Sequence, residues 1–319
     1  MKVTALVENT CVNQPLADSV CQLASMGNAP SMELQAEHGL SLYIQTETGL
    51  RILFDMGQGM LFARNAAILG CPIADVDVAV ISHGHYDHGG GLGEFLLLNG
   101  HAPVYLHRDA FQPHYSLRDD GLHYIGLDES LKDNPRIRLC SDPISIDPTA
   151  PVPCCNAIPD SNDNGSFRKF HNPQDFSAVL FSGVSASVLP PAGNKRLFGP
   201  AEYVCDDFCH EQSLIVREGD RTILFAGCAH TGIVNIMLKA QEITGKTPTH
   251  VFAGMHLMKS GLSSVEEDQY IQTLAETLLG FDGTQYYTMH CTGLEQYEKL
   301  KTKMKDRIEY FSCGQSVRN

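Results

Sequence analysis

The chain has 319 residues and a formal net charge of −14, with 23 lysines and arginines against 37 aspartates and glutamates. Such an acidic balance argues against a general binder of nucleic acid or of anionic membranes, because the surfaces of those proteins are basic. A hydrophobic fraction of 43% with 19% charged residues is typical of a compact globular protein. We therefore expect neither nucleic acid nor a membrane as a partner.

Strand and helix patterns alternate in the first third of the chain. Residues 1–7 favour a strand and lack the apolar core and cleavage site of a signal peptide. The patterns predict further strands over 39–45, 51–54, 76–81 and 104–106, and helices over 61–69 and 92–98. No stretch approaches 18 uncharged apolar residues, and the cysteines are scattered, so we expect a cytoplasmic protein with reduced thiols.

The middle of the chain, about 111–176, carries eight prolines and a turn-rich run over 160–165. This composition predicts a loop-rich insertion near the active site, with surface loops of no functional role as the alternative.

Regular alternation returns after residue 176. Strands are predicted over 178–181, 213–217, 222–225, 250–253 and 285–289, and helices over 232–243 and 294–304. A further helix is expected to open at a capping box of Ser264 and Glu267. The composition shows no linker, so we expect a single domain over 1–319, built of two α/β halves. The oligomeric state stays open.

The segment from Val80 to Leu92 concentrates metal-binding side chains at the end of a predicted buried strand. It reads Val-Ile-Ser-His-Gly-His-Tyr-Asp-His-Gly-Gly-Gly-Leu. Residues two apart share one face of a strand, so His83 and His85 can point to one ion. Asp87 and His88 lie past the strand end and can reach a second ion beside it. Imidazoles with one carboxylate suit Zn²⁺, with iron or manganese as alternatives.

This H-x-H-x-D-H signature resembles that of the metallo-β-lactamase-fold hydrolases. Segments 54–57, 225–230 and 288–293 are similar to other strand-end segments of the same superfamily. The resemblance implies an α/β protein, built as an αββα sandwich with a metal pair at one edge. A narrower resemblance, carried by 36–41, 227–233, 254–257 and 290–293, is to the 7,8-dihydropterin-6-methyl-4-(β-D-ribofuranosyl)aminobenzene-5′-phosphate synthase-like subfamily.

The resemblance implies a ligand set for two divalent ions. The implied ligands are His83 and His85 for the first ion, and Asp87, His88 and His290 for the second. His230 would complete the first site or bridge the two. The usual Pro-Gly-His-Thr segment is missing, because 182–185 has no histidine, and Cys228 replaces the family's bridging aspartate. The number of ions therefore stays open, and a packed thiol is favoured over a metal ligand for Cys228.

Other residues are expected to line the site. Asp55 is expected to hydrogen-bond the metal loop rather than to bind metal. His38 is expected near the same edge, and His256, after strand 250–253, fits a functional and a structural role equally well. Candidates for holding an anion are Arg108, Lys195, Arg196 and Lys259, although solvated surface cations are the default expectation.

The remaining histidines have no functional role in this interpretation. The spacing of Cys205, Cys209 and His210 could suit a separate zinc site, but we do not favour it. Surface positions or satisfied core positions are expected for His101, His107, His114, His123, His171 and His250.

The leading functional hypothesis is a metal-dependent hydrolase in which a metal-activated water attacks a small phosphorylated or ester substrate. Asp87 would position that water as well as bind metal. One alternative is an enzyme that condenses a dihydropterin diphosphate with an aminobenzene-ribose phosphate. A second alternative is a non-catalytic metal-binding module. A small anionic molecule is the expected partner in the enzymatic hypotheses.

Overall fold

The computed structural model describes residues 1–12, 33–141, 143–146, 176–201 and 203–318, and two mixed sheets dominate these residues. In spatial order the first sheet contains β17 (Ser316–Arg318), β1 (Lys2–Val7), β2 (Ser41–Gln45), β3 (Arg51–Phe54), β4 (Val78–Val80), β5 (Val104–His107) and β8 (Ile137–Cys140). The second contains β16 (Ile308–Tyr310), β15 (Gln285–Thr288), β14 (His250–Ala253), β13 (Arg221–Ala226), β12 (Ser213–Glu218), β10 (Phe176–Phe181) and β9 (Ile144–Ser145).

Helices and one small sheet complete the described part of the fold. The α-helices are α2 (Leu61–Leu69), α3 (Tyr86–Gly89), α4 (Leu92–Leu98), α5 (Ile233–Thr244), α6 (Ser264–Leu279) and α7 (Leu294–Met304). Short 3₁₀ turns are η1 (Ile73–Asp75), η2 (Glu129–Leu131), η3 (Ala192–Arg196), η4 (His290–Thr292) and η5 (Lys305–Arg307). The small sheet pairs β11 (Leu197–Phe198) with β6 (Tyr115–Arg118), which pairs with β7 (Gly121–Tyr124).

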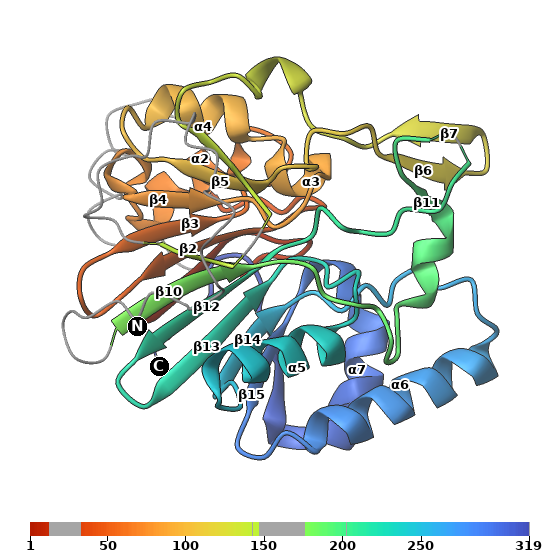
Figure 1. The fold of residues 1–319 in the computed structure, drawn as a ribbon. Coiled ribbons are helices and arrows are strands. Elements are labelled where there is room, and N and C mark those ends of the chain that lie inside the picture. The colour runs from red at the N-terminus through yellow and green to blue at the C-terminus, as the bar shows by residue number, and fades with distance from the viewer. Residues whose placement is uncertain (13–32, 142, 147–175, 202, 319) are drawn as a thin grey trace, which may run out of the picture.

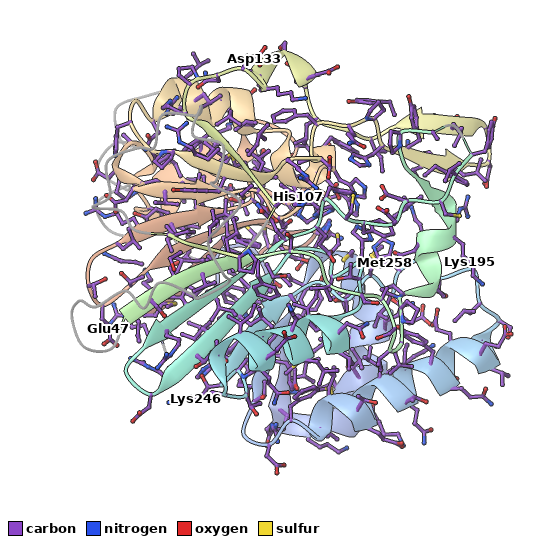
Figure 2. The ribbon with its side chains drawn as sticks, viewed as in Figure 1. Glu47, His107, Asp133, Lys195, Lys246 and Met258 are labelled. Carbon is purple, nitrogen blue, oxygen red and sulfur yellow. The ribbon has the colours of Figure 1, made fainter. Side chains whose placement is uncertain are left out.

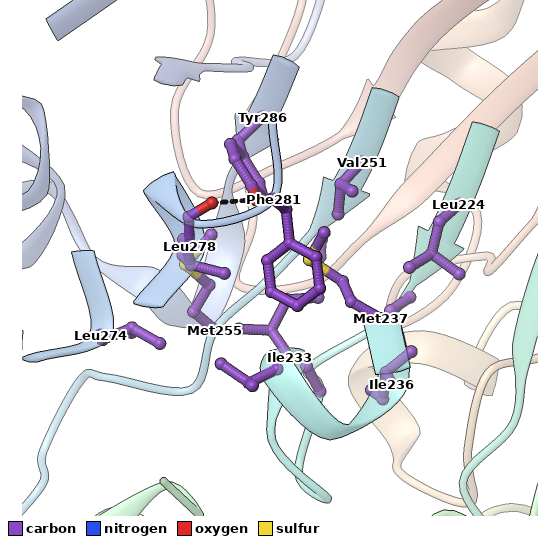
Figure 3. Close-up of a cluster of buried hydrophobic side chains, with 14 of the residues drawn as sticks. Leu224, Ile233, Ile236, Met237, Val251, Met255, Leu274, Leu278, Phe281 and Tyr286 are labelled. Carbon is purple, nitrogen blue, oxygen red and sulfur yellow. Dashed lines mark hydrogen bonds between the residues drawn. The ribbon is translucent and has the colours of Figure 1, made fainter. Parts of the chain in front are cut away.

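The two large sheets lie face to face, with α2 and α4 outside the first and α5, α6 and α7 outside the second (Figure 1). The predicted αββα sandwich is therefore confirmed. Alternation along the strands explains the layers, because successive side chains point to opposite faces. On β12, Val216 packs between the sheets with Phe54 of β3, whereas Ile215 packs outward with Met237 of α5. The outward cluster is closed by α6, where Leu278 accepts a hydrogen bond from Tyr286 Oη at 2.7 Å (Figure 3).

Each predicted strand and helix outside 111–176 lies within two residues of an observed one at either end, including the start of α6. There the expected capping box is off by one residue. Ser263, not Ser264, is the N-cap, since its backbone is extended and its side chain accepts from the Glu266 amide. Glu267 instead pairs with Lys299 on α7, with 2.8 Å between carboxylate and ammonium.

The segment expected to be loop-rich contains four short strands among its described residues. β6 and β7 form a hairpin across Asp119 and Asp120, β8 joins the first sheet beside β5, and β9 pairs with β10. These strands are short, and Pro113, Pro135 and Pro143 precede three of them, which concealed them from a pattern search. The turn-rich run 160–165 lies outside the described residues. No helix among the described residues is long and apolar enough to cross a bilayer.

Candidate metal centre

The histidine cluster lies where five strands end at one edge of the sandwich. β3 and β4 run parallel in the first sheet, with Phe54 opposite Val80, so Asp55 and the loop from Ile81 start side by side. In the second sheet β13, β14 and β15 are parallel, with Ala226, Ala253 and Thr288 in register. The loops carrying residues 227–230, 254–257 and 289–293 therefore meet the H-x-H-x-D-H loop at this edge.

Three buried imidazoles form the first half of the cluster. His83, His85 and His230 each offer a ring nitrogen, and these nitrogens lie within 4.8 Å of one another. His83 Nε2 and His85 Nδ1 are 3.0 Å apart. Burial lowers the pKa of all three imidazoles well below the ordinary value, and neighbouring histidines lower it further. The rings are therefore neutral, which is the form that binds a metal ion.

The second half of the cluster joins two imidazoles, a carboxylate and a thiol. His88 Nε2 lies 3.2 Å from His290 Nε2 and 3.2 Å from Cys228 Sγ. Asp87 Oδ2 lies 3.2 Å from His290 Nε2. Burial works against the charged form of Asp87, but His88 and His290 outweigh it and hold the pKa of the carboxyl well below its usual range. An anionic carboxylate thus faces both imidazoles.

Hydrogen bonds commit the Nδ1 atom of four of these histidines to an oxygen. His88 Nδ1 donates to Asp55 Oδ2 at 2.7 Å, and His290 Nδ1 donates to Asn9 Oδ1 at 3.0 Å. The corresponding bonds of His230 to Asn194 Oδ1 and of His83 to Ser82 Oγ are 3.1 and 2.9 Å. Each Nε2 is thereby turned toward the cluster, and such outer hydrogen bonds are what fixes metal-binding histidines in proteins.

The donor set fits a divalent cation. Among the described residues the buried Nε2 atom of His230 has no hydrogen-bond partner, although a buried polar atom without one is costly. Burial lowers the pKa of His88, but Asp55 and Asp87 outweigh it and raise the pKa to about 9. His88 therefore carries a proton where a cation would otherwise neutralise the two carboxylates. Nitrogen donors with one carboxylate are ligands that zinc accepts.

Four other predicted residues lie at or beside this cluster. Asp55 is fully buried behind it and accepts from the amide and hydroxyl of Ser82 at 2.7 and 2.8 Å. His38 Nε2 lies 3.3 Å from Asp87 Oδ2, at the solvent side. The His256 ring lies 4.3 Å from that of His230, and its buried Nδ1 has no partner among the described residues. Burial raises the pKa of the Cys228 thiol well above its ordinary value.

A cavity of about 570 Å³ opens from the cluster toward the small sheet. Its lining includes three cationic side chains, Arg118, Arg196 and Lys259. Met258 also lines the cavity. Figure 2 labels it close to Lys195, which belongs to η3. Of the predicted anion holders, Arg196 and Lys259 are in the lining, whereas Arg108 lies 3.6 Å from Asp109 and Lys195 is outside the lining.

Sequence reasoning missed two groups of residues. Arg118 has no motif around it, and only the fold of β6 places it on the cavity wall. Asn9 and Asn194 are remote in sequence from the histidines that they orient. His210 is buried against Asp206, whereas Cys205 and Cys209 are exposed, so the structure separates the suggested zinc ligands. His114, expected without a role, also contacts Asp206, at 2.8 Å.

Comparison with known proteins agrees with this architecture. The model of the metallo-beta-lactamase superfamily matches residues 35–156. An uncharacterized protein of Methanocaldococcus jannaschii is 29% identical over 83% of this chain and 88% of its own length. The 7,8-dihydropterin-6-methyl-4-(beta-D-ribofuranosyl)-aminobenzene-5′-phosphate synthase of the same organism is 25% identical, over 89% and 90%.

Among solved structures, Tm1679, a metal-dependent hydrolase of the beta-lactamase superfamily, is similar over essentially the whole chain. It has a TM-score of 0.70 and 25% identity, and the match covers 100% of this chain and 99% of that one. The sandwich described above is thus shared along its length.

Proposed function

We propose that this chain, which matches the metallo-beta-lactamase superfamily model over residues 35–156 and is similar to Tm1679 over its length, is a metal-dependent hydrolase of small anionic substrates. The observation that supports this most strongly is the convergence of imidazole Nε2 atoms whose Nδ1 atoms are already committed to oxygens. A divalent cation bound there supplies Lewis-acid activation of water and of the group under attack. The side chains of the protein hold the cation, position the attacking water and bind the anionic part of the substrate.

The proposed ligands follow the two halves of the cluster. They are His83, His85 and His230 for one ion, and Asp87, His88 and His290 for a second. We propose zinc as the metal, since imidazole dominates the set, with iron or manganese as the alternatives. The thiol of Cys228 lies beside His88, and we propose that it packs against the cluster rather than binding a cation.

Asp87 is the proposed catalytic residue of the chain. Its side chain is 11% exposed, and Asp87 lines the cavity with His38. The carboxylate accepts at Oδ2 and can hold an attacking water by hydrogen bonding while staying ionised, since its pKa is well below the usual range. His38 Nε2 can donate to the same Oδ2 from the solvent side and so fixes the carboxylate plane.

The cavity wall supports an anionic substrate. Arg118 and Arg196 come from the small sheet and η3, and Lys259 comes from the loop after β14, so cations line the cavity from different directions. Asp119 is in the same lining and partly offsets this charge. A phosphate or carboxylate that reaches this wall would leave its scissile bond near the histidine cluster. Small phosphorylated or ester compounds therefore fit best.

The similarity to the dihydropterin-type synthase of Methanocaldococcus jannaschii supports a second candidate function, the condensation of a dihydropterin diphosphate with an aminobenzene-ribose phosphate. The same cationic wall would then hold the diphosphate before it leaves. We place this second because hydrolysis needs only the donor cluster and water.

A substrate panel tests the proposal. Protein loaded with Zn²⁺, Mn²⁺ or Fe²⁺ is incubated with p-nitrophenyl phosphate, bis-p-nitrophenyl phosphate, p-nitrophenyl esters and a thioester. We expect metal-dependent turnover of at least one phosphorylated or ester compound. Turnover of none, with quenching of dihydropterin fluorescence and diphosphate release, would support condensation instead. Metal binding with neither result would point to a binding module.

Replacing Arg118 with alanine should weaken substrate binding rather than chemistry. A hydrogen bond to a charged group is worth about 1.5–3 kcal/mol, so we expect KM for the anionic substrate to rise by roughly tenfold or more, with kcat nearly unchanged. Steady-state kinetics with an anionic and a neutral ester measures the difference. Arg64→Ala, an exposed site on α2, is the matched control. An equal KM increase for both esters would contradict the assignment.

A further inference from the structure

A buried His-Asp-His unit lies beside the metal cluster and is not explained by it. Asp206 Oδ2 accepts from His114 Nδ1 at 2.8 Å and from His210 Nε2 at 3.2 Å. The side chains of all three residues are at most 3% exposed. These residues, called here the Asp206 triad, come from the segment after β5 and from the loop before β12.

The Asp206 triad fixes the backbone between the first two cluster histidines. The Gly84 amide, midway in the H-x-H motif, donates to His210 Nδ1 at 2.9 Å. On the other side of Gly84, a Cβ would lie 2.8 Å from His114 Nε2 and 2.3 Å from the Ala110 carbonyl oxygen. Only glycine fits this close approach, so the motif is clamped between the two triad imidazoles.

The Asp206 triad also faces the His85 side chain. Because His85 Nδ1 is turned to His83 Nε2, its proton resides on Nε2, which is buried without a partner among the described residues. His114 donates from Nδ1 to Asp206, so its own Nε2 is an acceptor, and this atom is buried and unpartnered too. The His85 and His114 ring centroids are 5.6 Å apart, and the ring nitrogens or carboxylate oxygens of His85 and the triad lie within 4.8 Å of one another.

We propose that the Asp206 triad is a positioning unit for the metal-binding form of His85. In the metal-bound form His85 Nε2 keeps its proton and directs it to His114 Nε2 as acceptor, Asp206 fixes the tautomer of His114, and His210 holds Gly84. This keeps the lone pair of His85 on Nδ1, aimed at the cation. The inference rests on the proposed function in so far as His85 is a metal ligand.

A cation held by the triad itself is the competing interpretation, and the hydrogen bonds disfavour it. Both imidazole nitrogens that face Asp206 carry protons, and His210 Nδ1 already accepts from a backbone amide. In the metal cluster, by contrast, the unprotonated His83 Nε2 and His85 Nδ1 face one another at 3.0 Å. The triad therefore has the donor and acceptor pattern of a closed hydrogen-bond chain.

Cobalt binding to the full chain tests the inference. We expect Asp206→Asn to weaken the first Co²⁺ equivalent by about 10- to 100-fold in a competition with a chromophoric chelator and to change the visible Co²⁺ absorption. Asp120→Asn is the matched control, since Asp120 pairs with His123 at 2.7 Å on the surface. It should leave affinity and spectrum unchanged.

A second pair of variants keeps the test independent of folding at Asp206. His114→Gln retains an acceptor for His85 and a donor for Asp206, so it should stay closer to wild type than His114→Leu, with circular dichroism showing the folded chain in both. Equal Co²⁺ affinity and spectra for these two variants would overturn the inference. The inference would also be overturned if Asp206→Asn lost one whole equivalent of Co²⁺ and bound the remaining Co²⁺ with wild-type affinity. Wild-type protein that binds no metal would instead refute the proposed function.

Discussion

The double substitution His83→Ala with His85→Ala is expected to remove most of the bound metal and to abolish turnover. Two of the three imidazoles in the first half of the cluster are lost at once, which leaves His230 as its last imidazole. If metal supplies several kcal/mol of transition-state stabilisation, the rate should fall by at least about a thousandfold. Elemental analysis of protein purified without chelator gives the metal content, and the substrate panel gives the rate.

A control must show that the loss of metal does not follow simply from removing any two histidines. His101 is exposed and His123 lies half-exposed beside Asp120, so His101→Ala with His123→Ala removes two imidazoles that are not part of the cluster. This control should keep the wild-type metal content. If the His83/His85 variant kept its metal as well, the ligand assignment would be wrong, and a cation at Cys228 and His290 would be the next hypothesis.

The parts of the site that could be predicted are those encoded within one short segment. His83, His85, Asp87 and His88 fall in six positions after a buried strand, so local spacing alone places them at one edge. Alternation similarly predicts β12 and β13, where neighbouring residues divide between the two faces. Such patterns repeat over several residues, and one mismatch does not hide them.

What could not be predicted depends on contacts of individual residues between remote segments. Asn9 and His290 are joined by two hydrogen bonds across 281 positions, and Asn194 and His230 by two across 36. His114 lacks any neighbour in sequence that suggests metal chemistry, and only the folded chain brings Asp206 to it. The capping box also failed on a one-residue ambiguity, because Ser263 and Ser264 both have a glutamate three positions on.

Replacing Asp55 with asparagine should cause the largest loss of stability of any substitution considered above. Asp55 is fully buried and accepts three hydrogen bonds, from the Ser82 amide, the Ser82 hydroxyl and His88 Nδ1, at 2.7, 2.8 and 2.7 Å. The asparagine side chain would turn its NH₂ group toward one of these donors, and His88 would no longer face a carboxylate. Breaking a buried charged pair costs about 3–5 kcal/mol, so we expect the unfolding midpoint to fall by roughly 10 °C.

The choice of asparagine separates the loss of the hydrogen bonds and the charge from any strain in the backbone at residue 55. Asp55 has a φ of 60°, a left-handed conformation that asparagine tolerates better than most residues, so the loss would come from the hydrogen bonds. Denaturant unfolding in chelator compares the variant with wild type in the absence of stabilisation by bound metal. Asp75→Asn breaks the exposed contact with Arg51 and should cost no more than about 1 kcal/mol. Equal losses for the two variants would mean that Asp55 does not hold His88 in place, and the second half of the cluster would need another anchor.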